Sequence, residues 1–366
     1  MKERPLIFER FPGLEGKIPW LCLGEFPTPV QKLNKLGAEL GLEKFYCKRD
    51  DLSNPEYGGN KVRKLEFLLA DAKLLNRKSV MTVGAWGSNH ILATTIFSRK
   101  VGLKTIGVMV PQCSQEYARK NLLLNFALGC EIYFANGMLS AVARGGKIYL
   151  QKWLREGRPY FIWAGGTNKL GILGYVNAGL EIAEQVKQGL LPKPDDIFCA
   201  AGSCGTFAGL VLGIKLAGLN TRVIGVRVYD RVMVNSFAVL RLARGSLRLM
   251  QRTDPAVPNL ELSTRDFPVL HEYVGDGYSI PTDAGLEAMR LAWELEGLVL
   301  DSTYTGKCLS GIISLARKGE LKGRVVVFLN SFNSKPVEKL VEKLPDWKEL
   351  PREFHHCFEG LQGRGK

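Results

Sequence analysis

Segments typical of buried β-strands alternate with helical patterns along most of this 366-residue chain. The strand-like segments are short, apolar and rich in β-branched residues, and they span 79–83, 104–110, 131–134, 160–163, 197–201, 222–228 and 324–329. Helical patterns cover 62–75, 89–101, 115–128, 174–188, 206–217, 284–296 and 306–317. Because parallel strands are joined by long crossovers that are usually helices, the alternation predicts an α/β fold with parallel sheets covered on both faces.

The predicted strands form two groups, one from about 79 to 163 and one from about 197 to 330, with a Gly-rich stretch at 165–168 between them. Two groups predict two open parallel sheets and therefore two domains, which agrees with roughly 100–200 residues per domain. Ligands of open α/β sheets bind beyond the carboxyl ends of the strands. The loops that follow the strands are therefore the candidate sites.

Charge and composition narrow the class of partner. The chain has 50 basic and 36 acidic residues, and its net charge of +14 would suit a nucleic acid, an anionic membrane surface or a small anionic ligand. The basic residues are scattered, so we expect no nucleic acid, and the alternative to an anionic partner is a solvated basic surface. No apolar run approaches the roughly 18 residues of a membrane span, so no membrane partner is expected. The eight cysteines form no CxxC motif, which indicates reduced thiols and a cytoplasmic protein. The run 355–357, His-His-Cys, lacks zinc-site spacing, so no metal is expected.

A lysine stands at the start of the first strong helix, after the run Gly-Gly-Asn at 58–60. A cation at this position opposes the positive end of the helix dipole, which favours the neutral amine. The neutral amine is the form that condenses with an aldehyde, so Lys61 is a candidate nucleophile. The alternative is an ordinary solvated helix face, which is what we expect for Arg63 and Lys64.

A second candidate loop follows the strand at 197–201 and opens a helix. It consists of Gly202, Ser203, Cys204, Gly205 and Thr206. The loop directs backbone N–H groups and two hydroxyls toward one point, which suits a phosphate dianion. Its spacing is neither the dinucleotide fingerprint nor a P-loop, so a cofactor with a single phosphate is the better match. The alternative is a tight turn that needs glycine for steric reasons.

A third loop places Ser88, Asn89 and His90 at the start of the next helix. This corner could bind a carboxylate, or its Ser and Asn could simply cap the helix while the histidine is structural. Tyr278 and Tyr304 lie in two further segments outside the predicted helices. They are either packing residues with a hydrogen-bonded hydroxyl or residues that face a substrate.

Together these segments resemble the 1-aminocyclopropane-1-carboxylate deaminase / D-cysteine desulfhydrase family, pyridoxal-phosphate enzymes of the tryptophan synthase β-like fold, also called fold type II. The matching pieces are Thr28-Pro29, Lys48-Arg49-Asp50-Asp51, the block from Gly58 to Glu66, Ser88-Asn89-His90, Gly165-Gly166 with Asn168, Gly174-Tyr175-Val176, the 202–206 loop and Tyr304-Thr305-Gly306-Lys307. They span most of the chain, about 27–329, and the lysine block is the most specific of them.

The resemblance implies a pyridoxal 5'-phosphate cofactor attached to Lys61 as a Schiff base. It places the 202–206 loop, Asn89, Thr305 and Ser331 at the cofactor. It also implies a large cofactor-binding domain of residues 1–63 and 174–366, a small domain of residues 64–173 that closes on the substrate, and a homodimer.

The resemblance further implies a small amino-acid substrate. Ser88, Asn89 and His90 would surround its carboxylate and the ring hydroxyl of the cofactor, while Tyr278 and Tyr304 would face it. Lys61, Ser88 and the two tyrosines are the expected catalytic residues. The freed lysine would move a proton at or near the substrate Cα.

Two departures from the family pattern bear on the reaction. Where the family has His-Thr-Gly-Gly after the last strand, this chain has Asn-Ser-Phe-Asn at 330–333, with the bulky Phe332 where a close backbone approach is expected. Cyclopropane-opening members carry a carboxylate directly after the second tyrosine, at the position of Thr305, and the desulfhydrase-like members carry a threonine at the position of Ser331. Cys204 and Ser279 are milder changes.

A hydroxyl at 305 cannot keep the ring nitrogen protonated as a carboxylate can, so carbanion stabilisation should be weaker. We therefore expect β-elimination from D-cysteine or a β-substituted alanine, giving a 2-oxo acid and ammonia. The alternatives are a 1-aminocyclopropane-1-carboxylate deaminase and a catalytically degenerate protein that only binds pyridoxal phosphate.

Overall fold

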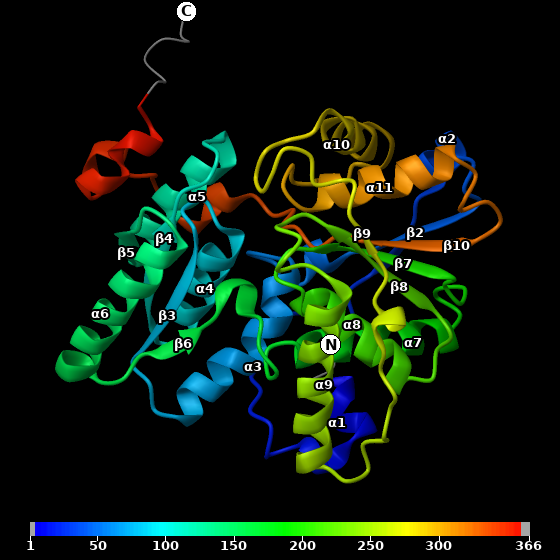
Figure 1. Ribbon diagram of the computed structural model, residues 1–366, viewed down its shortest axis with the longest axis horizontal. Coiled ribbons are helices and arrows are strands. Elements are labelled where there is room, and N and C mark those ends of the chain that lie inside the picture. The colour runs from blue at the N-terminus through cyan, green and yellow to red at the C-terminus, as the bar shows by residue number, and fades with distance from the viewer. Residues whose placement is uncertain (1–3, 360–366) are drawn as a thin grey trace, which may run out of the picture. The chain divides into compact units, whose positions relative to one another are not determined.

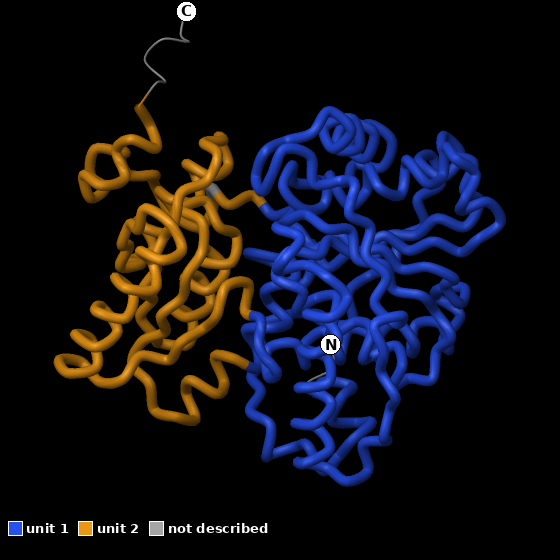
Figure 2. The backbone as a smooth tube through the Cα atoms, in the orientation of Figure 1, with its two compact units in different colours: residues 1–67, 167–335 blue, residues 68–166, 336–366 orange. Residues whose placement is uncertain are grey.

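The computed structural model describes residues 4–359, which divide into two compact units (Figure 2). The first unit comprises Met1–Phe67 and Thr167–Lys335, and the second comprises Leu68–Gly166 and Pro336–Lys366. The predicted domain boundaries, after residues 63 and 173, lie a few residues from two of these limits. Residues 336–359, however, group with the second unit, whereas the predicted division assigned them to the first.

The first unit contains a six-stranded sheet in the order β1-β2-β10-β7-β8-β9 (Figure 1). Its strands are β1 (Val30–Lys32), β2 (Lys44–Lys48), β7 (Asp196–Ala201), β8 (Arg222–Arg227), β9 (Val269–Leu270) and β10 (Val325–Leu329). The pairing is parallel throughout except at the edge, where β1 runs antiparallel to β2. All five residues of β10 are buried, as expected for an inner strand covered on both faces.

The second unit contains a four-stranded parallel sheet in the order β5-β4-β3-β6. Its strands are β3 (Ser79–Ala85), β4 (Lys104–Val110), β5 (Glu131–Phe134) and β6 (Tyr160–Ile162). The predicted architecture of two parallel sheets is therefore confirmed.

Helices cover both sheets (Figure 1). Those of the first unit are α1 (Leu6–Arg10), α2 (Asn34–Glu39), α7 (Leu173–Lys187), α8 (Gly205–Leu216), α9 (Ser236–Thr253), α10 (Asp283–Glu296) and α11 (Thr305–Arg317). Those of the second unit are α4 (Asn89–Lys100), α5 (Glu116–Ala127) and α6 (Met138–Glu156). The division between the units falls inside α3 (Asn60–Leu74). Among residues 4–359, no helix combines the length and the apolar character that a membrane crossing would require.

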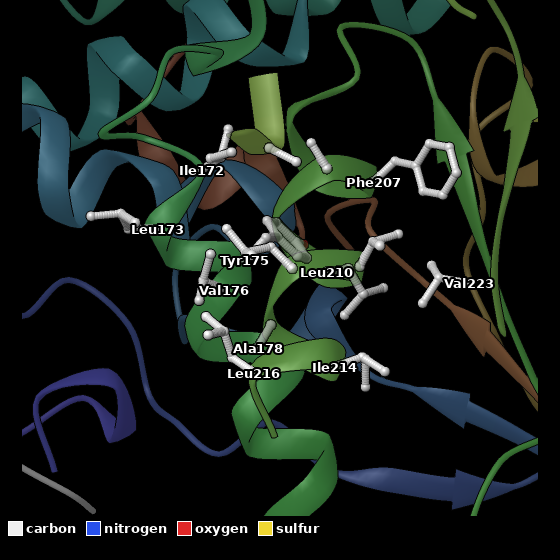
Figure 3. Close-up of a cluster of buried hydrophobic side chains, with 14 of the residues drawn as sticks. Ile172, Leu173, Tyr175, Val176, Ala178, Phe207, Leu210, Ile214, Leu216 and Val223 are labelled. Carbon is white, nitrogen blue, oxygen red and sulfur yellow. The ribbon is translucent and has the colours of Figure 1, made fainter. Parts of the chain in front are cut away.

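Packing of α8 against α7 forms the centre of the largest apolar core (Figure 3). Phe207, Leu210 and Ile214 of α8 and Val176 of α7 are all buried in this cluster. A Cβ atom on Gly213 would lie 2.2 Å from the carbonyl oxygen of Val176, so only glycine permits this close approach of the two helices. The loop that opens α8 is therefore attached to a closely packed helix pair.

The C-terminal segment of the second unit packs on the same unit's sheet and helices. Its short 3-10 helix Arg352–Cys357 contributes Phe354 to a core cluster that also contains Trp86, Leu122 and Phe134. The rings of Phe134 and Phe354 meet edge to face with their centroids 5.5 Å apart. Four residues of this segment, Leu350, Phe354, Cys357 and Phe358, thus complete a core of the second unit.

Candidate active site

Lys61 lies in the first turn of α3, and its amine donates a 2.7 Å hydrogen bond to the Oδ1 atom of Asn60. Removal of this amine from water lowers its pKa to about 8, while the negative charge of Asp301 acts in the opposite direction. This lowering of the pKa agrees with the prediction, made from the sequence, that the amine of Lys61 is activated. The leading cause is burial, whereas the sequence argument relied on the helix dipole.

Arg63 and Lys64 are each 1% exposed, so the expectation that they belong to a solvated helix face was wrong. Arg63 donates hydrogen bonds of 2.9 and 2.8 Å to the carboxylate of Asp50 and one of 2.9 Å to Glu181. The amine of Lys48 also binds Glu181. This buried cluster of charges joins the first turn of α3 to the end of β2 and to α7.

Lys64 reaches the loop that opens α8. Its Nζ atom lies 2.8 Å from the point where a Cβ atom on Gly205 would stand, and the Oγ1 atom of Thr167 lies 2.6 Å from that point. Burial, reinforced by the nearby charge of Lys61, keeps the pKa of Lys64 well below its ordinary value. Sequence reasoning missed this residue, although its spacing of three from Lys61 places both on one face of a helix.

The loop predicted to hold a phosphate connects β7 to α8. Cys204 adopts a left-handed conformation with a φ of 65°, and Gly205 begins the helix. The Ser203 hydroxyl accepts a 2.7 Å hydrogen bond from Thr167, and the Thr206 hydroxyl accepts a 3.0 Å hydrogen bond from the Nδ2 atom of Asn60.

The residues present match a phosphate group in three respects. First, Gly205 leaves open the space beside Lys64 that a side chain would fill. Second, that lysine amine is buried beside this space and could carry the positive charge that balances a phosphate dianion. Third, the N-terminus of α8 supplies backbone N–H groups and the positive end of a helix dipole.

Tyr304 precedes the first residue of α11 and Tyr278 lies in the loop before α10, and their hydroxyl oxygens are 2.6 Å apart. The ring of Tyr304 also borders the phosphate loop, because its Cε1 atom is 3.1 Å from the position of a Cβ atom on Gly202. The amine of Lys307 donates hydrogen bonds of 2.7 and 3.0 Å to the carbonyl oxygens of Val274 and Gly277. Lys307 thereby holds the segment that leads into Tyr278.

Thr305 is the first residue of α11 and is completely buried. Its hydroxyl donates to the carboxylate of Asp301, which also accepts hydrogen bonds from the backbone N–H groups of residues 303–305. Asp301 was not among the predicted site residues. Its position four residues before Thr305, at the start of a helix, is the signal that could have found it.

The segment that departs from the family pattern contacts the lysine loop through its backbone and through the side chain of Asn333. The carbonyl oxygen of Ser331 accepts a 3.1 Å hydrogen bond from the backbone N–H of Asn60. The carbonyl oxygen of Phe332 lies 3.1 Å from the position of a Cβ atom on Gly59, so the close backbone approach persists despite the bulky residue. The side chain of Asn333 accepts a 2.7 Å hydrogen bond from the N–H of Gly58.

Ser88, Asn89 and His90 belong to the second unit, at the start of α4. Ser88 caps this helix, because its hydroxyl accepts a 3.1 Å hydrogen bond from the backbone N–H of His90. The Nε2 atom of His90 lies 2.9 Å from the hydroxyl oxygen of Thr82, and Asn121 donates a 2.9 Å hydrogen bond to the Oδ1 atom of Asn89. The structure thus shows the capping geometry, while the carboxylate-binding role stays a prediction.

In the first unit the structure brings together Lys61, the 202–206 loop and the tyrosine pair. In the described part of the chain, no group of three or more His, Cys, Asp or Glu side chains has an arrangement that could hold a metal ion.

Comparison with known proteins defines the class of this site. The sequence profile of the pyridoxal-phosphate-dependent enzyme family matches residues 21–331. The chain belongs to this family, and its cofactor is pyridoxal 5'-phosphate.

Within the family, the chain is similar to two kinds of relative. It is 34% identical over 308 residues to the D-cysteine desulfhydrase of Salmonella paratyphi B, which covers 83% of this chain and 88% of the relative. It is 35% identical over 329 residues, covering 89% and 93% of the two chains, to a Pyrococcus furiosus protein assigned provisionally as a 1-aminocyclopropane-1-carboxylate deaminase.

Solved structures support the same placement. The crystal structure of a homologue of 1-aminocyclopropane-1-carboxylate deaminase matches with a TM-score of 0.76 and 35% identity, covering 90% of this chain and 95% of that one. The processed form of threonine deaminase isoform 2 from Solanum lycopersicum matches with a TM-score of 0.54 and 17% identity over 86% of this chain and 85% of that one, which shows a shared fold. The expected fold type II is therefore confirmed.

Proposed function

We propose that this chain catalyses β-elimination from a small amino acid, with D-cysteine or a β-substituted alanine as substrate. The products would be a 2-oxo acid, ammonia and the leaving group, which for D-cysteine is hydrogen sulfide. One observation carries the choice of reaction: the residue after Tyr304 is an uncharged threonine whose hydroxyl hydrogen is directed to Asp301. The 34% identity to a D-cysteine desulfhydrase supports the same choice.

Lys61 is the residue that would hold the cofactor. Its amine has a pKa of about 8, so an appreciable fraction is neutral near physiological pH and able to attack an aldehyde. The loop at 202–206 and Lys64 would bind the phosphate, with the lysine as the counter-charge. Pyridoxal phosphate, when bound, supplies a conjugated ring that accepts the electron pair of the broken Cα–H bond.

Lys61 would also move the proton of the reaction. Once the substrate amine has replaced it, the freed lysine is a base of pKa near 8 held by Asn60, and it can take the proton from the substrate Cα. The tyrosine pair offers a hydroxyl that can donate to a leaving thiolate, because each hydroxyl of the pair can be either donor or acceptor. Loss of the thiolate completes the elimination, and water then hydrolyses the enamine product, which breaks its C–N bond and gives the 2-oxo acid and ammonia.

The weaker electron sink is the physical reason for preferring a substrate with a built-in leaving group. A carboxylate in direct contact with a ring nitrogen stabilises its proton strongly. Here the hydroxyl of Thr305 would lie between the ring nitrogen and the carboxylate of Asp301, so this stabilisation is reduced. Elimination of a β-substituent needs less carbanion stabilisation than opening a cyclopropane ring that carries no leaving group.

The same contact also favours a second candidate. Because Asp301 does place a buried carboxylate behind Thr305, 1-aminocyclopropane-1-carboxylate deamination is the alternative that this site supports. The experiment that separates them compares kcat/KM for D-cysteine, β-chloro-D-alanine and 1-aminocyclopropane-1-carboxylate by 2-oxo acid release. We expect the first two to exceed the third by at least about a hundredfold. A preference for the cyclopropane substrate would overturn the proposal, and no turnover of any of the three would favour the degenerate alternative.

A further inference from the structure

The side chain of Asn60 lies between two parts of the site that the proposed function assigns to different ends of the cofactor. Its Nδ2 atom donates a 3.0 Å hydrogen bond to the hydroxyl of Thr206 in the phosphate loop. Its Oδ1 atom accepts a 2.7 Å hydrogen bond from the amine of Lys61. A single amide therefore connects the phosphate site to the reactive amine.

The orientation of this amide is determined by its partners. In its ammonium form Lys61 has only hydrogens to offer, so the side of the amide that faces it is the carbonyl, which accepts from the lysine in this structure. The NH₂ side then faces Thr206, whose hydroxyl oxygen accepts from it. The backbone of Asn60 is also held, because its N–H donates a 3.1 Å hydrogen bond to the carbonyl oxygen of Ser331.

The hydroxyl of Thr206 accepts from Asn60 and, among the described residues, donates to none. Its hydrogen is therefore available to an anion held at the N-terminus of α8, and Thr206 is the second residue of that helix. When a hydroxyl donates one hydrogen bond, its oxygen becomes a better acceptor for another, because neighbouring hydrogen bonds polarise each other. Occupation of the phosphate site should accordingly strengthen the contact from Thr206 to Asn60.

We propose that Asn60 is a positioning residue that couples occupation of the phosphate site to the orientation of the Lys61 amine. An anion bound by the phosphate loop would fix the Thr206 hydroxyl, the hydroxyl would fix the Asn60 amide, and the amide carbonyl would hold one hydrogen of the lysine amine. With that hydrogen held, the lone pair of the neutral amine is restricted to the two remaining tetrahedral positions on the nitrogen. The site would thus prepare Lys61 for an aldehyde only when the phosphate is in place.

The inference rests on the proposed attachment of pyridoxal phosphate to Lys61, and its test is designed to separate the two. The full-length chain, freed of cofactor, is mixed with pyridoxal, which has the aldehyde but no phosphate. The rate constant of imine formation is followed by absorbance, with and without saturating inorganic phosphate. The measured quantity is the ratio of the two rate constants.

In the wild-type chain we expect phosphate to raise the rate constant about tenfold, the effect of about one hydrogen bond. The ratio should fall to about one in Asn60→Leu, which keeps the size of the side chain, and in Thr206→Val, which keeps its shape. Thr206→Ser keeps the hydroxyl and should retain the wild-type ratio. Because the ratio should fall in each of the two variants independently, the test remains valid if one of them fails to fold.

Two results would overturn the inference. One is a wild-type ratio near one, and the other is a wild-type ratio that persists in Asn60→Leu or Thr206→Val, since the charge of the phosphate alone would then explain the acceleration. Failure of the proposed attachment gives a different outcome. In that case borohydride would fix no pyridoxal phosphate on Lys61 of the wild-type chain, whatever the ratio with pyridoxal.

Discussion

The hydroxyl of Thr305 donates a 2.6 Å hydrogen bond to the carboxylate of Asp301, and the backbone N–H of Asp301 donates a 2.8 Å hydrogen bond back to the same hydroxyl oxygen. The hydrogen of this hydroxyl is therefore already in use, and toward any third group Thr305 can act only as an acceptor. A protonated ring nitrogen is such a donor. The pair thus gives this site a carboxylate that acts through the hydroxyl of Thr305. The sequence alone shows only an uncharged threonine at this position.

Replacing Thr305 tests the importance of this pair for the reaction. Thr305→Val keeps the shape of the side chain but removes the hydroxyl, and we expect kcat/KM for β-chloro-D-alanine to fall about tenfold, the effect of one hydrogen bond. Thr305→Ser keeps the hydroxyl and serves as the matched control. Wild-type kinetics in the valine variant would show that the reaction does not depend on the Thr305–Asp301 pair.

Lys64 is expected to act on the phosphate alone. Lys64→Met approximately keeps the length of the side chain and removes a buried amine, so folding should survive, because replacing a buried ionisable group by an apolar group of similar size is often tolerated. We expect the Kd for pyridoxal phosphate to rise by roughly tenfold or more through loss of a charge-assisted contact, while the Kd for pyridoxal stays unchanged. Equal weakening of both ligands in a fluorescence titration would contradict this assignment.

The lowered pKa of Lys61 predicts a specific pH dependence. Because only the neutral amine attacks an aldehyde, the rate of imine formation in the cofactor-free chain should increase with pH and level off above a midpoint of about 8. An unperturbed lysine would give a midpoint near 10.4. Stopped-flow absorbance across pH 6–11 measures the midpoint, and a value close to that of free lysine would show that Lys61 is not desolvated in solution.

The buried charges around Arg63 predict a large effect on stability. Arg63→Met would leave the carboxylates of Asp50 and Glu181 without their main partner, and removal of one member of a buried ion pair costs about 3–5 kcal/mol. The exposed ion pair of Arg317 with Glu287 supplies the control, since Arg317→Met should cost less than about 1 kcal/mol. The free energies of unfolding come from urea denaturation, and equal losses in the two variants would refute the argument.

Much of the fold follows from local patterns in the sequence. The predicted strand 104–110 coincides with β4, and the predicted helix 284–296 differs from α10 by one residue, because buried parallel strands and amphipathic helices have distinct periodicities. The strand β2 was missed because both of its ends are lysines. Lys48 is tolerated inside the sheet because its amine binds Glu181, which lies 133 residues further along the chain, as well as Gln185 and the carbonyl oxygen of Thr28.

The candidate site shows the same division between local and long-range information. Lys61 and the phosphate loop could be predicted, because a lysine at a helix start and a glycine turn after a strand are local signals. The burial of Lys64 could not, because its position beside Gly205 depends on how α3 meets the loop before α8. The long helix α9 was also missed, although its arginines at 241, 244, 248 and 252 recur at helical spacing and mark a polar face opposite a buried one.

The attachment of pyridoxal phosphate to Lys61 is the central claim, and one labelling experiment tests it most directly. The full-length chain is loaded with pyridoxal phosphate, reduced with sodium borohydride, digested and analysed by mass spectrometry that resolves Lys61 from Lys64. Both amines have lowered pKa values, so each is chemically able to react. The structure predicts the reduced cofactor on Lys61 alone. Its appearance on Lys64 or another lysine, or on none, would contradict the claim.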